Sequence, residues 1–170
     1  YSGVDYNRAG VPLMETVSEP DMRSADEAYA YLTNLKEIMQ YGDISDCDME
    51  KGQMRCDVNI SLRPWGQAEF GTKIELKNLN SFRAVHRAIE FEIVRQAELI
   101  DQGVKLRQET RGGNDDRGEA YLMRTKEEAH DYRYFPDPDL MPVRFTAAQI
   151  AAVKAELPEL PQAMRERFVR

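Results

Sequence analysis

The chain has 170 residues, of which 42% are hydrophobic and 31% charged, and this balance excludes an intrinsically disordered protein. No stretch approaches the roughly 18 uninterrupted apolar residues that a membrane span needs. With 23 Lys and Arg against 30 Asp and Glu, the net charge is −7, which disfavours a protein that grips a polynucleotide mainly by neutralising its phosphates.

Apolar residues recur at helical spacing in three segments, and each segment begins at a residue type that caps helices. These segments, with their caps, are 24–41 (Ser24, with Glu27 completing a capping box), 80–102 (Asn80 or Ser81) and 146–157 (Thr146). Gly42 and Gly103 stand where the first two helices should end. Pro158 and Pro161 mark a boundary, after which residues 162–170 begin another helical element.

Alternating apolar and polar residues predict two hairpins. The first joins residues 53–63 to residues 70–77 through a turn, and the second joins residues 104–111 to residues 119–125. Because hairpins and helices come in blocks without β-α-β alternation, we expect an α+β fold with an antiparallel sheet and packed helices. Trp65 in the first turn and the aromatic segment 131–139 are expected to pack against the fold rather than to stack on a ligand.

The polar face of the first hairpin is the most informative feature. It carries Arg55, Asp57, Asn59, Lys73, Glu75 and Lys77. Asp and Asn disfavour strands, yet Asp57 and Asn59 lie in the middle of one. Mg²⁺ takes carboxylate and amide oxygens together with phosphate oxygens, and neighbouring Lys and Arg side chains can hold those phosphates. The pattern is typical of a Mg–nucleotide platform, and the alternative is an exposed sheet face whose mixed charges are merely solvated.

The remaining candidates are isolated. Glu15, between two prolines, is a second possible metal ligand, although an exposed loop glutamate is more often only solvated. His86 is expected to be a surface or half-buried helix residue, and His130 has no Ser or Cys nucleophile motif beside it. The absence of a P-loop motif and of G-x-G-x-x-G after a strand disfavours P-loop, Rossmann and ordinary protein-kinase enzymes. Cys47 and Cys56 form no C-x-x-C pair, so the reducing cytoplasm is the expected compartment.

Five segments together resemble one protein family, in the family's order and over essentially the whole chain. They are Val11–Asp21, Asp46–Asn59, Glu75–Phe82, Gln108–Arg111 and Asp131–Asp139. The chain resembles the B subunit of the aspartyl/glutamyl-tRNA amidotransferases, the GatB family.

The resemblance implies a cradle domain similar in fold to glutamine synthetase and the guanidino kinases. Residues 1–157 would form a truncated part of this ATP-dependent cradle, and residues 158–170 would begin a helical domain. We expect the chain to be a piece of a longer protein, because the family's amino-terminal Glu-x-His and Met-Glu-Glu-Asp metal ligands and its carboxy-terminal tRNA-binding domains are not in this sequence. The fragment alone is then expected to be inactive.

The family's activity uses Mg²⁺ and ATP to phosphorylate the side-chain carboxylate of mischarged Glu-tRNA(Gln) or Asp-tRNA(Asn). Ammonia from glutamine hydrolysis on the glutaminase partner (the A subunit) then displaces phosphate, and the C subunit ties the other two together. By resemblance, Glu15, Asp57 and Glu75 are the expected catalytic, metal-binding carboxylates. Strand geometry places three further residues near ATP, namely Arg55, Asn59 and Lys77.

Two other functions remain open from the sequence. One is an ATP-dependent amide ligase of the glutamine synthetase type that acts on a free amino acid. The other is a non-catalytic scaffold that docks a glutaminase and whose charged face is only solvated.

Overall fold

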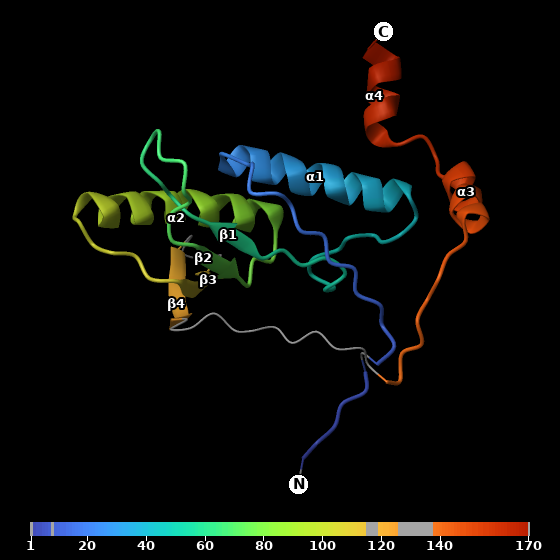
Figure 1. Cartoon of the computed structure of the whole chain (residues 1–170), viewed down its shortest axis with the longest axis horizontal. Helices are drawn as coiled ribbons and strands as arrows, with labels where there is room; N and C mark the ends of the chain where they lie inside the picture. Colours follow the sequence, from blue (N-terminus) through green and yellow to red (C-terminus); the bar gives the residue numbers. More distant parts are fainter. Residues whose placement is uncertain (1, 8, 115–118, 126–137, 170) are drawn as a thin grey trace.

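A computed structural model describes residues 2–7, 9–114, 119–125 and 138–169 of the chain (Figure 1). The described part holds a four-stranded sheet and four helices. In chain order the elements are α1 (Ala25–Tyr41), β1 (Val58–Ile60), β2 (Ile74–Lys77), α2 (Phe82–Asp101), β3 (Glu109–Asn114), β4 (Glu119–Thr125), α3 (Ala147–Glu156) and α4 (Pro161–Val169). None of the described helices is long and apolar enough to cross a membrane.

The predicted helices and their caps are confirmed. The Ser24 hydroxyl accepts a hydrogen bond from the amide of Glu27 at 3.1 Å, which starts α1. The Ser81 hydroxyl does the same for α2, and Thr146 forms a complete capping box with Gln149 at the start of α3. Each cap satisfies an amide that the first helical turn would otherwise leave without a partner.

The sheet has the order β1-β2-β3-β4, and both predicted hairpins are present. The β1–β2 and β3–β4 pairs are antiparallel, but β2 and β3 pair in parallel, so the sheet is mixed. The prediction of a purely antiparallel sheet is therefore wrong. The reason is that α2 carries the chain back along the sheet between β2 and β3, which makes a β-α-β crossover that joins the two hairpins.

The first hairpin is shorter than the alternation predicts. Strand pairing ends where Ile60 lies opposite Ile74. The backbone amide of Leu62, two residues further along, donates to the Gln96 side chain of α2 at 3.1 Å rather than to the neighbouring strand. Conversely, the second hairpin is longer, since β3 continues through Gly112 and Gly113, which the sequence placed in the turn.

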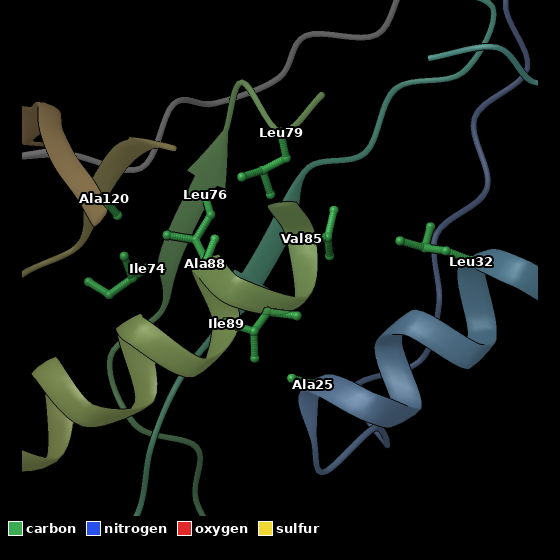
Figure 2. Packing of buried hydrophobic residues seen from close by; sticks show 9 residues of the cluster. All are labelled: Ala25, Leu32, Ile74, Leu76, Leu79, Val85, Ala88, Ile89 and Ala120. Carbon is green, nitrogen blue, oxygen red and sulfur yellow. The ribbon is translucent and has the colours of Figure 1, made fainter. Parts of the chain in front are cut away.

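The hydrophobic core lies where α2 packs between the sheet and α1 (Figures 1 and 2). It includes residues from every layer: Ala25, Leu32, Ile74, Leu76, Leu79, Val85, Ala88, Ile89 and Ala120. The apolar positions of the 53–63 alternation pack against this cluster as predicted, among them Met54, Cys56, Val58 and Ile60. Burial of this one side of the hairpin turns the other side toward solvent.

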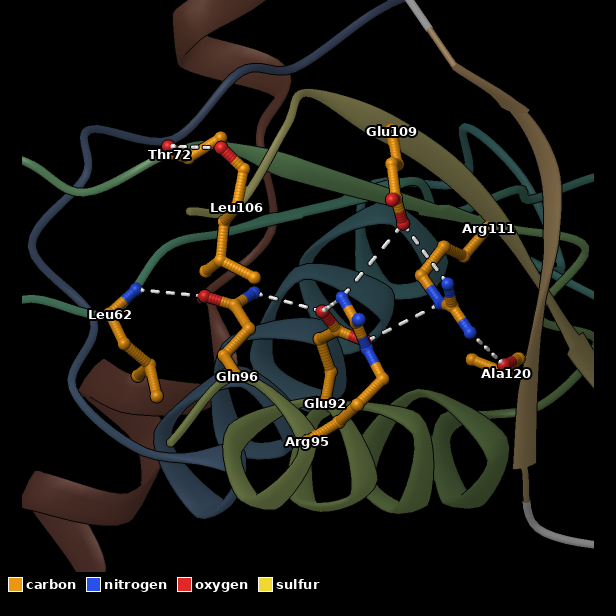
Figure 3. Close-up of polar contacts among 9 residues, drawn as sticks. All are labelled: Leu62, Thr72, Glu92, Arg95, Gln96, Leu106, Glu109, Arg111 and Ala120. Carbon is orange, nitrogen blue, oxygen red and sulfur yellow. Dashed lines mark hydrogen bonds and ion pairs between the residues drawn. The ribbon is translucent and has the colours of Figure 1, made fainter. Parts of the chain in front are cut away.

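A buried carboxylate interrupts the apolar face of α2 (Figure 3). Glu92 is fully buried, and its two oxygens accept hydrogen bonds from Arg95 at 2.6 and 2.9 Å. Gln96, also fully buried, donates to the same carboxylate at 2.9 Å. An isolated buried carboxylate would be strongly destabilising, and these donors offset that penalty.

Arg111 of β3 connects this carboxylate to the sheet. Its Nε lies 3.7 Å from Glu92 Oε2, its Nη1 binds Glu109 at 3.0 Å, and its Nη2 donates to the Ala120 carbonyl of β4 at 2.6 Å. Among the described residues the buried Nε finds no hydrogen-bond partner, and the Glu92 charge beside it offsets part of the cost. Helix α2 is thereby tied to β3 and β4 by charge as well as by apolar contact.

Trp65 does not pack against the fold. It is fully exposed at the turn of the first hairpin, which contradicts the prediction of a packing role. Nearby, Arg63 stacks on Phe70 with 4.9 Å between the guanidinium carbon and the ring centroid. The aromatic segment 131–139 lies mostly outside the described residues, as does His130.

The segment that follows β1 and the segment that precedes β2 come close together at Gly71. A Cβ at this position would overlap the carbonyl oxygen of Leu62, whereas a Cβ at Gly66 would meet no atom and would strain only the backbone, whose φ is +86°. We expect Gly71→Ala to lower the free energy of unfolding by about 3 kcal/mol or more and Gly66→Ala by about 1 kcal/mol. Urea unfolding followed by circular dichroism measures both; equal losses would contradict the close approach.

The charge on Glu92 can be tested in the same way. Glu92→Gln keeps the shape but leaves two guanidinium groups facing a neutral amide, and we expect a loss of about 3 kcal/mol in the free energy of unfolding. Glu90 is exposed on the same helix, so Glu90→Gln should change it by less than about 0.5 kcal/mol. Similar losses in the two variants would contradict a stabilising role for the ion pairs of the buried carboxylate.

Candidate functional site

The polar face of the first hairpin is assembled as the alternation predicts. Asn59 of β1 lies directly opposite Glu75 of β2, so the two side chains share one face of the sheet. Asp57, just before β1, reaches the same face and binds Lys77 at the end of β2. The buried neighbours Ile74 and Leu76 point to the opposite face, toward α2.

Two carboxylates converge on one ammonium group. Lys77 Nζ lies 2.9 Å from Asp57 Oδ2 and 3.4 Å from Glu75 Oε1. The hydrogen bond that Lys77 donates to Asp57 raises the pKa of Lys77 above its ordinary value. The Glu75 side chain is the most enclosed of the three, with 17% of its surface exposed against 51% for Asp57. The two strands thus hold a pair of negative charges around a single cation position.

A residue of β3 completes the surroundings of Glu75. Thr110 pairs with Glu75 in the parallel ladder, and its hydroxyl donates to Glu75 Oε2 at 2.8 Å. Sequence reasoning missed Thr110, because it did not predict the parallel pairing that brings β3 beside β2. The sequence contained a signal for this parallel pairing, because a strand, a helix of about 20 residues and a second strand are the elements of a crossover between parallel strands.

The polar face ends at β4. Gly112 follows Thr110 on the same side of β3 and lies beside Lys77 in the ladder. A Cβ at Gly112 would come within 2.6 Å of the Tyr121 ring, so the ring lies over this glycine. The aromatic ring of β4 therefore borders the polar surface that β1 and β2 provide.

Two of the predicted site residues are not joined to this cluster. Glu15 lies exposed in the irregular segment before α1, and Arg55 is exposed in the segment that leads to β1. Across the described ranges, no three His, Cys, Asp or Glu side chains come close enough together to hold a metal ion. The roles of Glu15 and Arg55, and the metal-binding roles of Asp57 and Glu75, stay predictions.

His86 is half-buried on α2, as predicted, and serves a structural contact. Its Nε2 lies 2.8 Å from Asp26 of α1, and its ring meets Tyr29 edge-on. These contacts help to dock α1 on α2 and are separate from the polar face.

The face has the chemistry of a site for a cation and an anionic ligand. Carboxylate and amide oxygens are hard ligands of the kind that Mg²⁺ prefers, and Asp57 and Glu75 already share one positive charge in the structure. The Lys77 ammonium beside them is a donor suited to phosphate oxygens. The fold and this face together define an α+β domain with an acidic–basic sheet surface.

Comparison with known proteins identifies the family. The model of the GatB/GatE catalytic domain matches residues 1–151, so the chain belongs to this family. It is 61% identical over 170 residues to the B subunit of the aspartyl/glutamyl-tRNA(Asn/Gln) amidotransferase of Persephonella marina, covering all of this chain and 36% of the relative. The B subunit of the same name from Solidesulfovibrio magneticus is 61% identical over 168 residues, which are 99% of this chain and 35% of that protein.

A third relative, a B subunit of the same name from a Thermoanaerobacter species, is 57% identical over 166 residues, or 98% of this chain. The chain spans about a third of the length of these relatives. The family resemblance seen in the sequence is thereby confirmed over the whole chain.

The residue before Asp57, Cys56, faces the core, and this burial affects the reactivity of its thiol. Cys56 points to the core side, and burial, with a smaller contribution from Asp57, raises the pKa of its thiol to about 11. We expect Cys56 to react with iodoacetamide at pH 8 at least about 30-fold more slowly than free cysteine does, because the thiolate is the reacting form.

Mass spectrometry of the alkylated peptides measures this rate, and the urea-unfolded chain, in which both cysteines are accessible, is the control. Alkylation of Cys56 in the folded chain at the rate of free cysteine would place the thiol on the polar face and reverse the register.

Proposed function

We propose that this chain forms part of the catalytic domain of a tRNA-dependent amidotransferase. The domain would use ATP and Mg²⁺ to phosphorylate the side-chain carboxylate of Glu-tRNA(Gln), Asp-tRNA(Asn) or both. The observation that carries this proposal is the convergence of Asp57 and Glu75 on one cation position, on the exposed face of a domain that belongs to the GatB/GatE catalytic family. We further propose the cradle architecture of glutamine synthetase and the guanidino kinases for the complete domain.

The residues of the polar face divide between two tasks. Asp57 and Glu75 would bind Mg²⁺, with Glu15 as a third carboxylate. A bound Mg²⁺ would neutralise phosphate oxygens of ATP and the negative charge that grows during transfer. Three residues would lie near the ATP phosphates, namely Arg55, Asn59 and Lys77. With Asp57 and Glu75 bound to a metal ion, the ammonium of Lys77 would be available to a phosphate oxygen.

The reaction needs two steps because a carboxylate is a poor acyl donor. In the first, an oxygen of the substrate side chain attacks the γ-phosphorus of ATP, ADP leaves, and an acyl phosphate forms. In the second, ammonia attacks the acyl carbon, phosphate leaves, and loss of a proton gives the amide. Water would hydrolyse the acyl phosphate, so the ammonia must arrive sheltered from bulk solvent.

This need for sheltered ammonia favours a complex in which a glutaminase supplies it. Each of the relatives is named as a B subunit, and we propose the A subunit as the glutaminase and the C subunit as the third member. With a net charge of −7, this part of the protein would contribute little to tRNA affinity, and other parts of the full-length protein would bind the tRNA mainly. We propose that the assembly works in the cytoplasm.

The proposal can be tested in the full-length protein assembled with its partners. Asp57→Asn and Glu75→Gln should each lower ATP-dependent amide formation on mischarged tRNA by at least about 100-fold, while glutamine hydrolysis by the partner persists. The exposed Glu98 of α2 provides a matched control, and Glu98→Gln should leave both activities unchanged. Circular dichroism of each variant confirms folding.

Three results would contradict the proposal. Normal amide formation in folded Glu75→Gln would remove Glu75 from the site. Amide formation on free glutamate without tRNA would favour a ligase of the glutamine synthetase type. No binding of Mg–ATP to the full-length protein, measured by isothermal titration calorimetry, would favour a non-catalytic scaffold.

A further inference from the structure

Thr110 brings a buried hydroxyl to the proposed site, on the same face of the sheet as Glu75. The residue lies in β3, only 1% of its surface is exposed, and the parallel ladder sets it beside Glu75. Its Oγ1 donates to Glu75 Oε2 at 2.8 Å, while Lys77 Nζ lies 3.4 Å from the other oxygen, Oε1. The two oxygens of Glu75 are thus in different environments: one is bound from the neighbouring strand, and the other points to the side shared with Asp57.

The hydrogen bond from Thr110 and the ion pair with Lys77 together restrict the rotation of the Glu75 side chain. A glutamate has three rotatable bonds, and ordering such a side chain costs conformational entropy. A hydrogen bond to one carboxylate oxygen selects a conformation before any ligand arrives. In metal sites, the groups that orient ligating carboxylates typically contribute 10- to 100-fold to metal affinity.

The position of Thr110 is itself fixed by the contacts of the next residue in β3, Arg111. Arg111 follows it in β3 and is held by Glu92 of α2 and by the Ala120 carbonyl of β4. The strand can therefore shift little along β2, and the hydroxyl stays opposite Glu75. Threonine also suits the place, because its β-branched side chain favours a strand.

We infer that Thr110 is a positioning residue, which holds the Glu75 carboxylate so that Oε1 faces the cation position shared with Asp57. This inference rests on the proposed function, since it assigns Thr110 to the site that Asp57 and Glu75 would form. In this role the hydroxyl acts through Glu75 and not by contact with ATP or the reacting carboxylate.

The test compares Thr110→Val with Thr110→Ser in the full-length protein with its partners, using Mn²⁺ as the probe for the metal. Valine keeps the shape and lacks the hydroxyl, whereas serine keeps the hydroxyl and lacks a methyl group. We expect Thr110→Val to raise the Kd for Mn²⁺, measured by electron paramagnetic resonance, by about 10- to 100-fold. Thr110→Ser should stay within about 3-fold of the unmodified protein, and the Mg²⁺ concentration for half-maximal activity should follow the same order.

Asp57→Asn separates this inference from the proposed function. If Asp57→Asn weakens Mn²⁺ binding and Thr110→Val does not, the role of Thr110 is wrong and the proposed site stands. If Asp57→Asn leaves Mn²⁺ binding unchanged, the proposed site itself is wrong. Equal weakening by serine and valine would show that packing, rather than the hydroxyl, is what Thr110 supplies, and would overturn the inference.

A double variant keeps the inference testable whatever the stability of each single variant. If Thr110 acts only through Glu75, then Thr110→Ala added to Glu75→Gln should weaken Mn²⁺ binding no further than Glu75→Gln alone. Additive losses would mean that Thr110 acts independently of Glu75. Should Thr110→Val fail to fold, Thr110→Ala and Thr110→Ser give the same comparison of a lost and a kept hydroxyl.

Discussion

The buried carboxylate of Glu92 is the constraint on which the arrangement of the sheet depends. A buried charge must be compensated, and Glu92 accepts hydrogen bonds from Arg95 and Gln96 of its own helix and has the guanidinium of Arg111, from the sheet, 3.7 Å away as a counter-charge. Apolar packing already resists a shift of α2 over the sheet. A buried charge with partners in both layers adds a further penalty to any such shift, because the shift would leave the charge without its partners.

The alignment of β3 with α2 also determines the polar face, because adjacent residues of β3 point to opposite faces of the sheet. In β3, Arg111 points to α2, and Thr110, by alternation, points to the other face, where it binds Glu75. The side of the sheet that builds the core and the side that would bind a cation are thus set by the same backbone register. If β3 were shifted by one residue, Arg111 and Thr110 would exchange faces, and the contacts of both side chains would be lost.

Sequence patterns predicted the local features well. Alternation placed Asp57, Asn59, Glu75 and Lys77 on one face, and capping residues located the starts of α1, α2 and α3. The parallel β2–β3 pair was missed because strand direction depends on how α2 crosses the sheet, which is a tertiary property. The network around Glu92 was also missed, although a glutamate and a glutamine at helical spacing within the apolar stripe of α2 were its visible signal.

The central claim is that a divalent cation binds at the polar face beside Glu75. Mn²⁺ is paramagnetic and broadens nearby nuclear resonances, so methyl-labelled threonine in the full-length protein reports its position directly. We predict that Mn²⁺ at low stoichiometry broadens the methyl resonance of Thr110, which touches Glu75, far more strongly than that of Thr33 on α1. Asp57→Asn should restore the Thr110 resonance. A sharp Thr110 resonance in the Mn²⁺-loaded protein would contradict the claim.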